Sequence, residues 1–153
     1  MSPVDGVPEL YRDPATAERV ALIARSFARL VGRPLVISSG DIVTELWEAP
    51  FAVVAHGTEP DPIFFFGNRY ALAAFESDVK AFTQMPSRLS AEAPLREERQ
   101  ALLDRVGRDG FIDDYAGVRI SARGRRFRID GAIVWNLIDE NGERRGQAAT
   151  FAL

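Results

Sequence analysis

The sequence contains no cysteine and only one histidine, His56. Without cysteine the chain forms no disulfide, carries no thiolate nucleophile and binds no metal through sulfur. Histidines that bind metals usually occur in groups with regular spacing, so one histidine is a weak metal motif. We therefore predict no metal and no cofactor from these residue types.

Long hydrophobic runs are absent as well. The apolar stretches are short and interrupted by charged residues, so none has the length of a membrane-spanning helix. The first residues, MSPVDGVPELYRDP, carry acids and prolines where a signal peptide has basic residues and an apolar core. We expect a cytoplasmic protein without a membrane partner.

Motifs for several common activities are missing. No phosphate-binding loop, dinucleotide-binding fingerprint or nucleophile motif is present, so an enzyme is not the expected function. The net charge of −3 gives no general attraction to nucleic acid. What is present is typical of a globular domain with one core: 153 residues, 46% hydrophobic and 27% charged.

The N-terminal third predicts helices. We expect an extended arm over 1–13, then a helix over 14–31 that begins with Asp13 as the N-cap and Pro14 as its first residue. Apolar residues follow at helical spacing, and Gly32 ends the helix. A second helix is expected over 41–48. We divide the chain into the arm (1–13), a helical extension (14–49) and a main domain (50–153).

The main domain predicts an antiparallel sheet. Two short strands, a short helix and a longer helix come first, followed by three strands; the expected ranges are 51–55, 63–66, 68–75, 95–106, 111–120, 126–138 and 145–151. An Asn-Gly pair within 139–142 predicts a hairpin. This order fits an α+β, PAS-like five-stranded antiparallel sheet, with the last strand beside the first and helices on one face.

Alternation along 126–138 predicts which side chains share a face. One parity holds Phe127, Ile129, Ile133, Trp135 and Leu137. The other parity carries Arg128, Asp130 and Asn136, but also Val134 and Ile138. We expect the N-terminal helix to cover that second, partly apolar face.

Three separated blocks carry a family resemblance. They are LWEAPFAVVAHGTEPDPIFFFGNRYALAAFE (46–76), MPSRLSAE (85–92) and DGFIDDYAGVRISARGRRFRIDGAIVWNLIDENG (109–142). The chain resembles the MEKHLA domain, a PAS-like domain found alone in bacteria and at the C-terminus of plant class III homeodomain–leucine-zipper proteins. The bacterial stand-alone form is the closer match. The resemblance implies a domain that senses a signal and controls dimerisation in the plant proteins.

Three functions remain open. The leading hypothesis is a sensory or small-molecule-binding regulatory module that acts through dimerisation or docking on a protein partner. The second is a ligand-free interaction scaffold with a filled core. The third is a small isomerase or hydrolase, which requires His56 and either Asp113 or Asp114 to face one pocket.

Aromatic residues of the sheet are candidates for a ligand cavity. With Trp135 directed inward beside Phe127, Ile133 and Tyr115, they would line a space between sheet and helices. A filled core is the competing interpretation. Among the three successive phenylalanines, Phe65 is expected to share a face with Ile63, while Phe64 and Phe66 lie on the other.

Polar residues supply further candidates. Arg88 could bind an anionic ligand, helped by Ser87 or Ser90, or could pair with Glu59 or Asp113 and close its loop. His56, Glu59 and Asp61 could hold a metal, although a loop histidine bonded to its neighbours is the simpler interpretation.

Two further groups of residues indicate which kinds of partner the protein is expected to bind. The arginines of the hairpin at 119–128 are interpreted as solvated and paired with acids, so no nucleic-acid partner is expected; they are Arg119, Arg123, Arg125, Arg126 and Arg128. The apolar stripe of the N-terminal helix is the candidate interface that transmits a ligand signal to a homodimer or protein partner; it comprises Val20, Ile23, Phe27 and Leu30.

Overall fold

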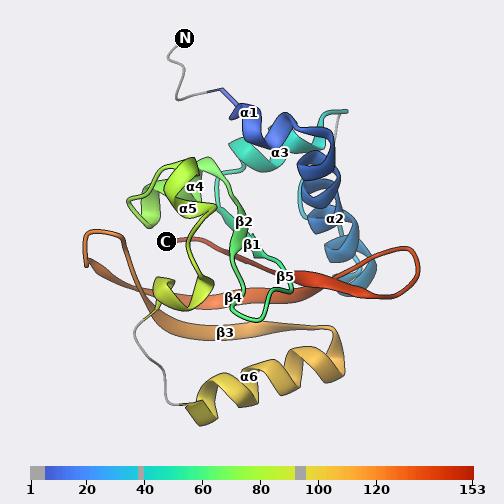
Figure 1. The fold of residues 1–153 in the computed structure, drawn as a ribbon. Helices are drawn as coiled ribbons and strands as arrows, with labels where there is room; N and C mark the ends of the chain where they lie inside the picture. Colours follow the sequence, from blue (N-terminus) through green and yellow to red (C-terminus); the bar gives the residue numbers. More distant parts are fainter. Residues whose placement is uncertain (1–5, 38–39, 92–95) are drawn as a thin grey trace.

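The computed structural model describes residues 6–37, 40–91 and 96–153, and its centre is a five-stranded antiparallel sheet in the order β2-β1-β5-β4-β3 (Figure 1). The strands are β1 (Ala52–His56), β2 (Phe64–Gly67), β3 (Phe111–Ile120), β4 (Arg126–Ile138) and β5 (Arg144–Phe151). The last strand pairs with the first, so the predicted sheet is confirmed.

Among the described residues, three helices precede the sheet: α1 (Glu9–Arg12), α2 (Pro14–Val31) and α3 (Ile42–Glu48). The predicted N-terminus of α2 is confirmed, because the Asp13 carboxylate accepts a hydrogen bond from the Thr16 backbone N–H. Gly32 ends the helix with a left-handed φ of 86°, which glycine adopts without steric cost.

The prediction of an extended arm is corrected where the structure describes it, since 9–12 form one helical turn. Residues 1–5 lie outside the described part. Tyr11 is fully buried, and its hydroxyl donates to the Gly67 carbonyl at 3.0 Å and accepts from the Gly67 N–H at 3.1 Å. The sequence pattern does not show this anchor because it depends on a contact 56 residues away.

In the described part of the connection from β2 to β3, the helices are α4 (Arg69–Ala74), α5 (Val79–Phe82), the 3-10 helix η2 (Ser87–Ser90) and α6 (Arg96–Asp109). The short helices α5 and η2 were not predicted. The last helix continues past the predicted Val106 to Asp109, and Gly110, with a φ of 84°, follows it. The predicted first residue, Leu95, lies outside the described residues.

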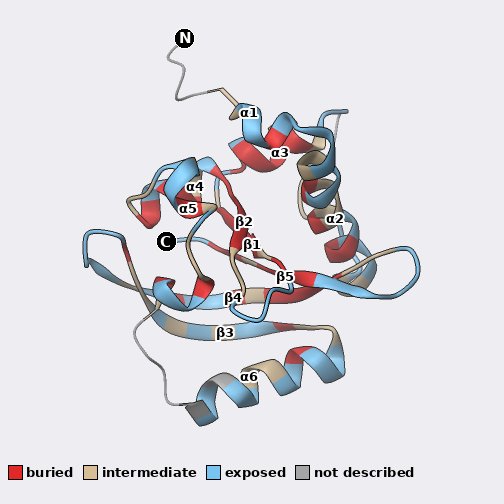
Figure 2. Cartoon of the chain, in the orientation of Figure 1, coloured by how far each residue is buried: buried red, intermediate tan, exposed pale blue. Residues whose placement is uncertain are grey.

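Helices cover both faces of the sheet, and α6 lies on the opposite side of β3 and β4 from α2 (Figure 1). The α2 face carries Trp135, whose ring meets the Phe27 ring edge-on at 4.8 Å. On the other face, Val134 packs with Val106 of α6 and with Ile112. The expectation that the N-terminal helix covers Val134 is therefore corrected. Figure 2 shows the buried positions of α2 turned toward the sheet.

A β-bulge in β4 explains this exchange of faces. Ile129 pairs with Gly117 and Ala132 with Tyr115, so Asp130 and Gly131 together oppose one residue of β3. One extra residue reverses the alternation of all side chains beyond it. Gly131 has a φ of 63°, a conformation that suits glycine.

The side chains on the two sides of the bulge consequently do not share one face as predicted. Before it, Phe127 packs against Phe75 and Phe151, with ring centroids 5.2 and 6.4 Å away. After it, Trp135 belongs to the α2 face.

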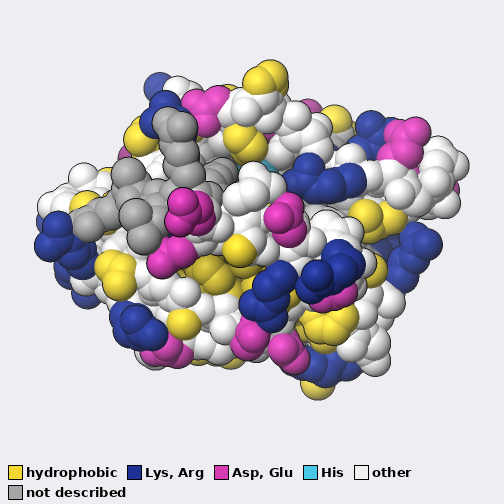
Figure 3. Space-filling model, turned by 90° about the horizontal axis from the view of Figure 1, so that it is seen from below, with side chains coloured by type: hydrophobic (Ala, Val, Ile, Leu, Met, Phe, Trp, Pro, Cys, Tyr) yellow, Lys and Arg dark blue, Asp and Glu magenta, His cyan; other side chains and the backbone are white. Residues whose placement is uncertain are grey.

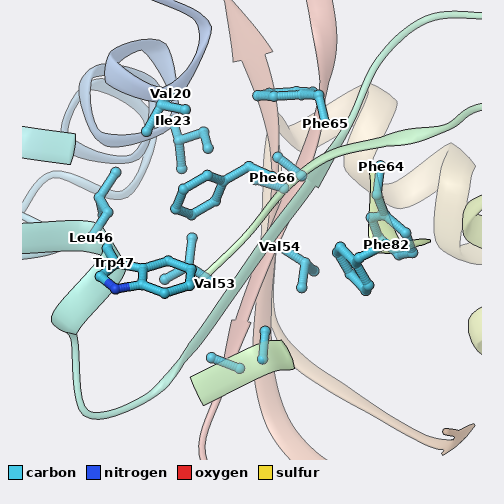
Figure 4. Close-up of a cluster of buried hydrophobic side chains, with 14 of the residues drawn as sticks. Val20, Ile23, Leu46, Trp47, Val53, Val54, Phe64, Phe65, Phe66 and Phe82 are labelled. Atoms are coloured by element: carbon cyan, nitrogen blue, oxygen red, sulfur yellow. The ribbon is translucent and has the colours of Figure 1, made fainter. Parts of the chain in front are cut away.

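A second irregularity separates Phe64 from Phe66. Ala55 pairs with Phe66 and His56 with Phe64, which leaves Phe65 as an extra residue in β2. Phe64 stacks on Phe82 at 4.3 Å, whereas Phe66 contacts Tyr11 at 4.7 Å, and Figure 4 shows the two rings directed to opposite sides of the strand. The prediction that they share a face is wrong for this reason.

Asn68 confirms the predicted cap of α4 and also connects three elements. Its Oδ1 accepts from the backbone N–H groups of Ala71 and Val53 at 3.0 and 3.1 Å. Its Nδ2 donates to the carbonyls of Leu46 and Phe51 at 3.0 and 2.8 Å. All four hydrogen-bonding positions of this fully buried amide are therefore used.

No helix among the described residues combines the length and the apolar character that a membrane crossing requires.

Candidate functional site

A cavity of about 510 Å³ lies between the sheet and the helices that follow β2. Its floor includes Val54, Ala149 and Val134, which are register partners on β1, β5 and β4. Phe64 and Phe75 add aromatic walls, and α6 adds leucines. Small apolar side chains make a flat floor here because neighbouring strands lie about 4.8 Å apart.

A row of three polar side chains borders this floor. His56 pairs in register with Gln147, and Gln147 with Asn136, so one residue from each of β1, β5 and β4 lies side by side on the cavity face. We call these three residues the polar row. The Nδ1 atom of His56 lies 2.9 Å from the Gly57 carbonyl. Because a carbonyl only accepts, neutral His56 in this contact carries its proton on Nδ1.

Asn136 is held on two sides. Its Nδ2 donates to the Val106 carbonyl of α6 at 3.2 Å, and its Oδ1 accepts from Arg144 Nε at 3.2 Å. These bonds use half of the hydrogen-bonding capacity of the amide and fix its orientation.

Gln147 differs from its neighbour. Its side chain lines the cavity in a residue that is 9% exposed, and no hydrogen bond joins its amide to another residue that the structure describes. A group that enters the cavity can therefore form hydrogen bonds with this amide.

The far end of the cavity holds a second polar group. Arg119 donates to Ser90 Oγ at 3.1 Å and to the Tyr115 hydroxyl at 3.2 Å, and Ser90 donates to the Ser87 carbonyl at 2.6 Å. Gly117 makes room for this arrangement, because a Cβ there would lie 2.7 Å from the Tyr115 hydroxyl. Tyr115 therefore lies across its own strand to meet Arg119.

Five of the seven predicted ligand-binding residues lie in three different places. Ser90 and Tyr115 line the cavity. Phe127 lies behind Phe75 and Phe151. Ile133 and Trp135 are on the α2 face, so the prediction that Trp135 walls the cavity is corrected; the bulge at Gly131 is the cause.

Phe65 and Arg88 both lie apart from the cavity lining. The Arg19 guanidinium stands 4.0 Å above the Phe65 ring, a cation–π contact with α2. Arg88 Nε donates to both oxygens of Asp61, at 3.2 and 3.1 Å, at the surface. This is the loop-closing pair that was expected with Glu59 or Asp113, made instead with Asp61.

Sequence reasoning missed most of the polar lining. Asn136 was expected to point away from the cavity, and Gln147, Arg144 and Arg119 were not considered as ligand contacts. The available signal was Gln147 itself, a polar residue that begins the otherwise apolar run QAATF.

The conditions for the metal and enzyme hypotheses are not met by the described residues. Glu59 accepts from the Ile63 N–H, and no group of three His, Asp or Glu side chains suited to a metal occurs among the residues that the structure describes. Asp113 and Asp114 are exposed, and Asp114 pairs with Arg105 at 2.9 Å. Neither aspartate therefore shares the cavity with His56.

The arginine hairpin is partly paired as expected. Arg128 pairs with Asp130, whereas Arg125 pairs with Glu76 of the segment after α4. Figure 3, which views the molecule from below, shows basic and acidic side chains intermingled over that face.

Tyr11 and Asp41, both outside the cavity, have strongly shifted pKa values. Burial raises the pKa of Tyr11 to about 12. Hydrogen bonds from Thr44 and then Arg12 lower the pKa of Asp41, the N-cap of α3, to about 2. Tyr11 connects α1 to Gly67 of β2, and Asp41 connects the start of α3 to Arg12 of α1.

The strand order and the helices between β2 and β3 define a PAS-like fold. The light-state dimer of the fungal blue-light photoreceptor Vivid is similar, with a TM-score of 0.61 at 13% identity, covering 86% of this chain and 93% of that one. A PAS domain from Colwellia psychrerythraea is similar with a TM-score of 0.58 at 13% identity, covering 69% of this chain and 87% of that one.

The family follows from the sequence. The model of the MEKHLA domain matches residues 17–153, and the chain belongs to this family. Homeobox-leucine zipper protein ATHB-9 of Arabidopsis thaliana is 24% identical over an alignment of 159 residues, which covers 99% of this chain and 19% of the relative. ATHB-14 from the same plant is 25% identical over 145 residues, covering 90% of this chain and 17% of the relative. The chain thus spans about a fifth of the length of these relatives.

Proposed function

We propose that this domain is a sensory regulatory module that binds a small molecule in the cavity between the sheet and α6. The observation that carries the proposal is the cavity itself, about 510 Å³ with an apolar floor and a few convergent polar groups. Ligand sites in proteins commonly have this size and this mixture of apolar walls with a few placed polar groups. The family and the PAS-like fold support the same function.

The end of β4 supplies a route from the cavity to α2. Asn136 faces the cavity and donates to α6, while its neighbour Trp135 donates from Nε1 to the Ile23 carbonyl of α2 at 3.1 Å. Two residues after Asn136, the backbone N–H of Ile138 donates to Ser26 Oγ of α2 at 2.9 Å. Consecutive residues of one strand therefore hold the helices on opposite faces.

The apolar stripe of α2 fits a transmitting role. Val20, Ile23 and Phe27 are fully buried against the sheet, and Leu30 is half-buried. A direct contact of the three buried residues with a partner would require α2 to leave the sheet. We propose that ligand binding changes the packing of this stripe and thereby the surface that α2 offers to a second copy or another protein.

The names of similar proteins support a function that acts through dimerisation or the binding of another protein. The Arabidopsis relatives are called homeobox-leucine zipper proteins, and one structural neighbour is a light-state dimer. We propose by analogy that this domain controls dimerisation or docking of a partner.

Native mass spectrometry tests the binding step. Protein purified under mild conditions is measured intact and then after denaturation. We expect an additional mass on the intact protein that is lost on denaturation, and the same spectra report whether the protein is a monomer or a dimer. If the intact protein carries no additional mass and a screen of small molecules shifts no cavity resonance in NMR spectra, the ligand-free scaffold replaces this proposal.

Hydrogen exchange tests the transmission step. With a ligand bound, we expect the backbone amides of α2 near Ile23 and Phe27 to change their protection, although α2 does not line the cavity. Unchanged exchange in α2 under conditions where the cavity is occupied would contradict the proposed route.

A further inference from the structure

The cavity carries positive charge although the protein as a whole is acidic. The net charge of the chain is −3, with 22 acidic residues against 19 lysines and arginines. Among the described residues that line the cavity, however, none is an aspartate or a glutamate, while two are arginines, Arg119 and Arg144. A molecule that enters therefore meets a positive potential, which favours an anion.

Neither arginine is paired with an acid in the described part of the chain. Arg119 donates to the hydroxyls of Ser90 and Tyr115, and Arg144 donates from Nε to the amide oxygen of Asn136. All of these acceptors are neutral, whereas several arginines at the surface pair with carboxylates. The cavity thus holds two cationic groups whose charge no neighbouring acid balances.

The end of the cavity at Arg119 is the better anion site, because Arg119 is partly buried whereas Arg144 is exposed. The Ser90 hydroxyl gives its proton to the Ser87 carbonyl. The Tyr115 hydroxyl accepts from Arg119 and donates to no group that the structure describes, so its proton can meet a ligand. The two hydroxyls also leave N–H groups of Arg119 unused. A guanidinium beside a phenolic O–H is a set of donors that an oxyanion satisfies.

The remainder of the cavity suits an apolar body. Its floor consists of Val54, Ala149 and Val134, and phenylalanine and leucine side chains form its walls. A ligand charged along its length would bury charge against this surface without a partner. A single carboxylate matches the single charge of Arg119 and can accept two parallel hydrogen bonds from a guanidinium, whereas a phosphate monoester carries more charge.

We propose that the ligand is an amphipathic organic acid, whose carboxylate binds Arg119 and the Tyr115 hydroxyl while its apolar part lies on the sheet. The inference rests on the proposed function, because it assumes that the cavity binds a small molecule, and it adds the chemical class of that molecule. The anion-binding arginine is then Arg119 and not the predicted Arg88, which pairs with Asp61 at the surface.

The test uses three probes that share one alkyl chain: octanoate, 1-octanol and n-octylamine. Each is titrated at millimolar concentrations and neutral pH into uniformly ¹⁵N-labelled protein, and NMR follows the backbone amides of the floor and the Nε–H of Arg119. Arg119→Gln removes the charge, and Tyr115→Phe removes only the hydroxyl. Arg123→Gln, at an exposed position of the same hairpin outside the cavity lining, is the matched control for the loss of one positive charge.

We expect octanoate to bind more tightly than n-octylamine, and at least about tenfold more weakly to Arg119→Gln than to the original protein, as the loss of a charge-assisted hydrogen bond requires. Tyr115→Phe should weaken octanoate severalfold, and Arg123→Gln should bind it like the original protein. Because 1-octanol carries no charge, it should bind equally to the original protein and to Arg119→Gln, which also reports whether the cavity of the variant is intact.

The results that would overturn the inference are distinguishable. If n-octylamine binds as tightly as octanoate, or if Arg119→Gln weakens octanoate no more than Arg123→Gln does, the cavity binds ligands but the anionic class is wrong. If Arg144→Gln weakens octanoate and Arg119→Gln does not, the assignment to Arg119 is wrong. Where Arg119→Gln does not fold, an unchanged octanoate affinity of Tyr115→Phe contradicts the inference. If none of the three probes shifts any cavity signal, the cavity is not a binding site, and the proposed function fails together with the inference.

Discussion

Replacing Asn68 by alanine removes four hydrogen bonds from the interior in one step. The backbone N–H groups of Val53 and Ala71 lose their acceptor, and the carbonyls of Leu46 and Phe51 lose their donor. A typical intramolecular hydrogen bond contributes about 1 kcal/mol net, and each buried group left unpaired costs more. We expect Asn68→Ala to lower the free energy of unfolding by about 3–5 kcal/mol.

Urea unfolding, followed by far-UV circular dichroism, measures this loss. Asn141→Ala, at an exposed turn position, is the matched control and should change stability by less than about 0.5 kcal/mol. A domain of this size has a stability of only about 5–15 kcal/mol, so Asn68→Ala is expected to be marginal at 37 °C. A loss below about 1 kcal/mol would refute the reasoning, since it would mean that water or a rearranged backbone replaces all four bonds.

Asn68→Asp is a second test of the hydrogen bonds that this side chain makes. The carboxylate keeps both acceptor contacts but faces the carbonyls of Leu46 and Phe51, to which it cannot donate. Protonation restores one donor, so the pKa of this carboxyl should be raised in the folded state. The extra stability of the Asn68→Asp variant over the Asn68→Ala variant is then greatest in acid, and it is lost as the pH rises through that pKa. A flat pH profile would show that the two carbonyl contacts contribute little.

Three further predictions concern other parts of the fold. The pKa of Tyr11 in the folded protein, about 12, exceeds the ordinary value of 10.0. Its contribution to the free energy of unfolding is therefore full below pH 10 and falls by about 2–3 kcal/mol as the pH rises through 12. Tyr11→Phe should lack this loss of stability at high pH. Gly117→Ala should displace the Tyr115 hydroxyl, which a Cβ would approach to 2.7 Å, and shift the Tyr115 ring signals in NMR spectra without unfolding the protein. Trp135→Phe should remove the bond to the Ile23 carbonyl, destabilise the protein by about 1–3 kcal/mol and increase hydrogen exchange in α2; unchanged exchange would contradict this linkage.

Local signals in the sequence were sufficient for most elements. Asp13 with Pro14, Asn68 and Gly32 mark helix ends through contacts within a few residues, and the structure has them as predicted. The three long strands alternate clearly enough to be recognised, and the Asn-Gly pair predicts the hairpin between the last two. The order of the elements along the chain predicts a PAS-like sheet with the last strand beside the first, and the structure confirms this pairing.

The faces of the sheet could not be predicted in the same way. Counting alternate residues assumes an unbroken strand, and the extra residues at Gly131 and Phe65 reverse the count. A glycine in a strand is a hint of a bulge but does not identify which side chains change face. The uncounted extra residue at Gly131 explains why Trp135 was predicted to line the cavity and Asn136 was predicted to point away from it.

The polar lining was hidden for a related reason. His56 lies on a strand that is far in the sequence from the hairpin carrying Asn136 and Gln147, and only the register of the sheet brings the three together. Tyr11 is a similar case, since nothing within the first helical turn indicates that its hydroxyl meets Gly67.

The contact of Tyr11 with Gly67 also has a consequence for solubility. β2 is an edge strand, and the backbone groups of such a strand are a template for edge-to-edge aggregation. Here one phenol takes both the N–H and the carbonyl of Gly67, and at the other end the Phe64 N–H donates to the Met85 carbonyl at 3.2 Å. Both ends of β2 are thus closed to strand addition from another molecule. A protein shortened to begin after Asp13 would expose the Gly67 end, and its tendency to form intermolecular β-sheet should rise even where its own fold survives.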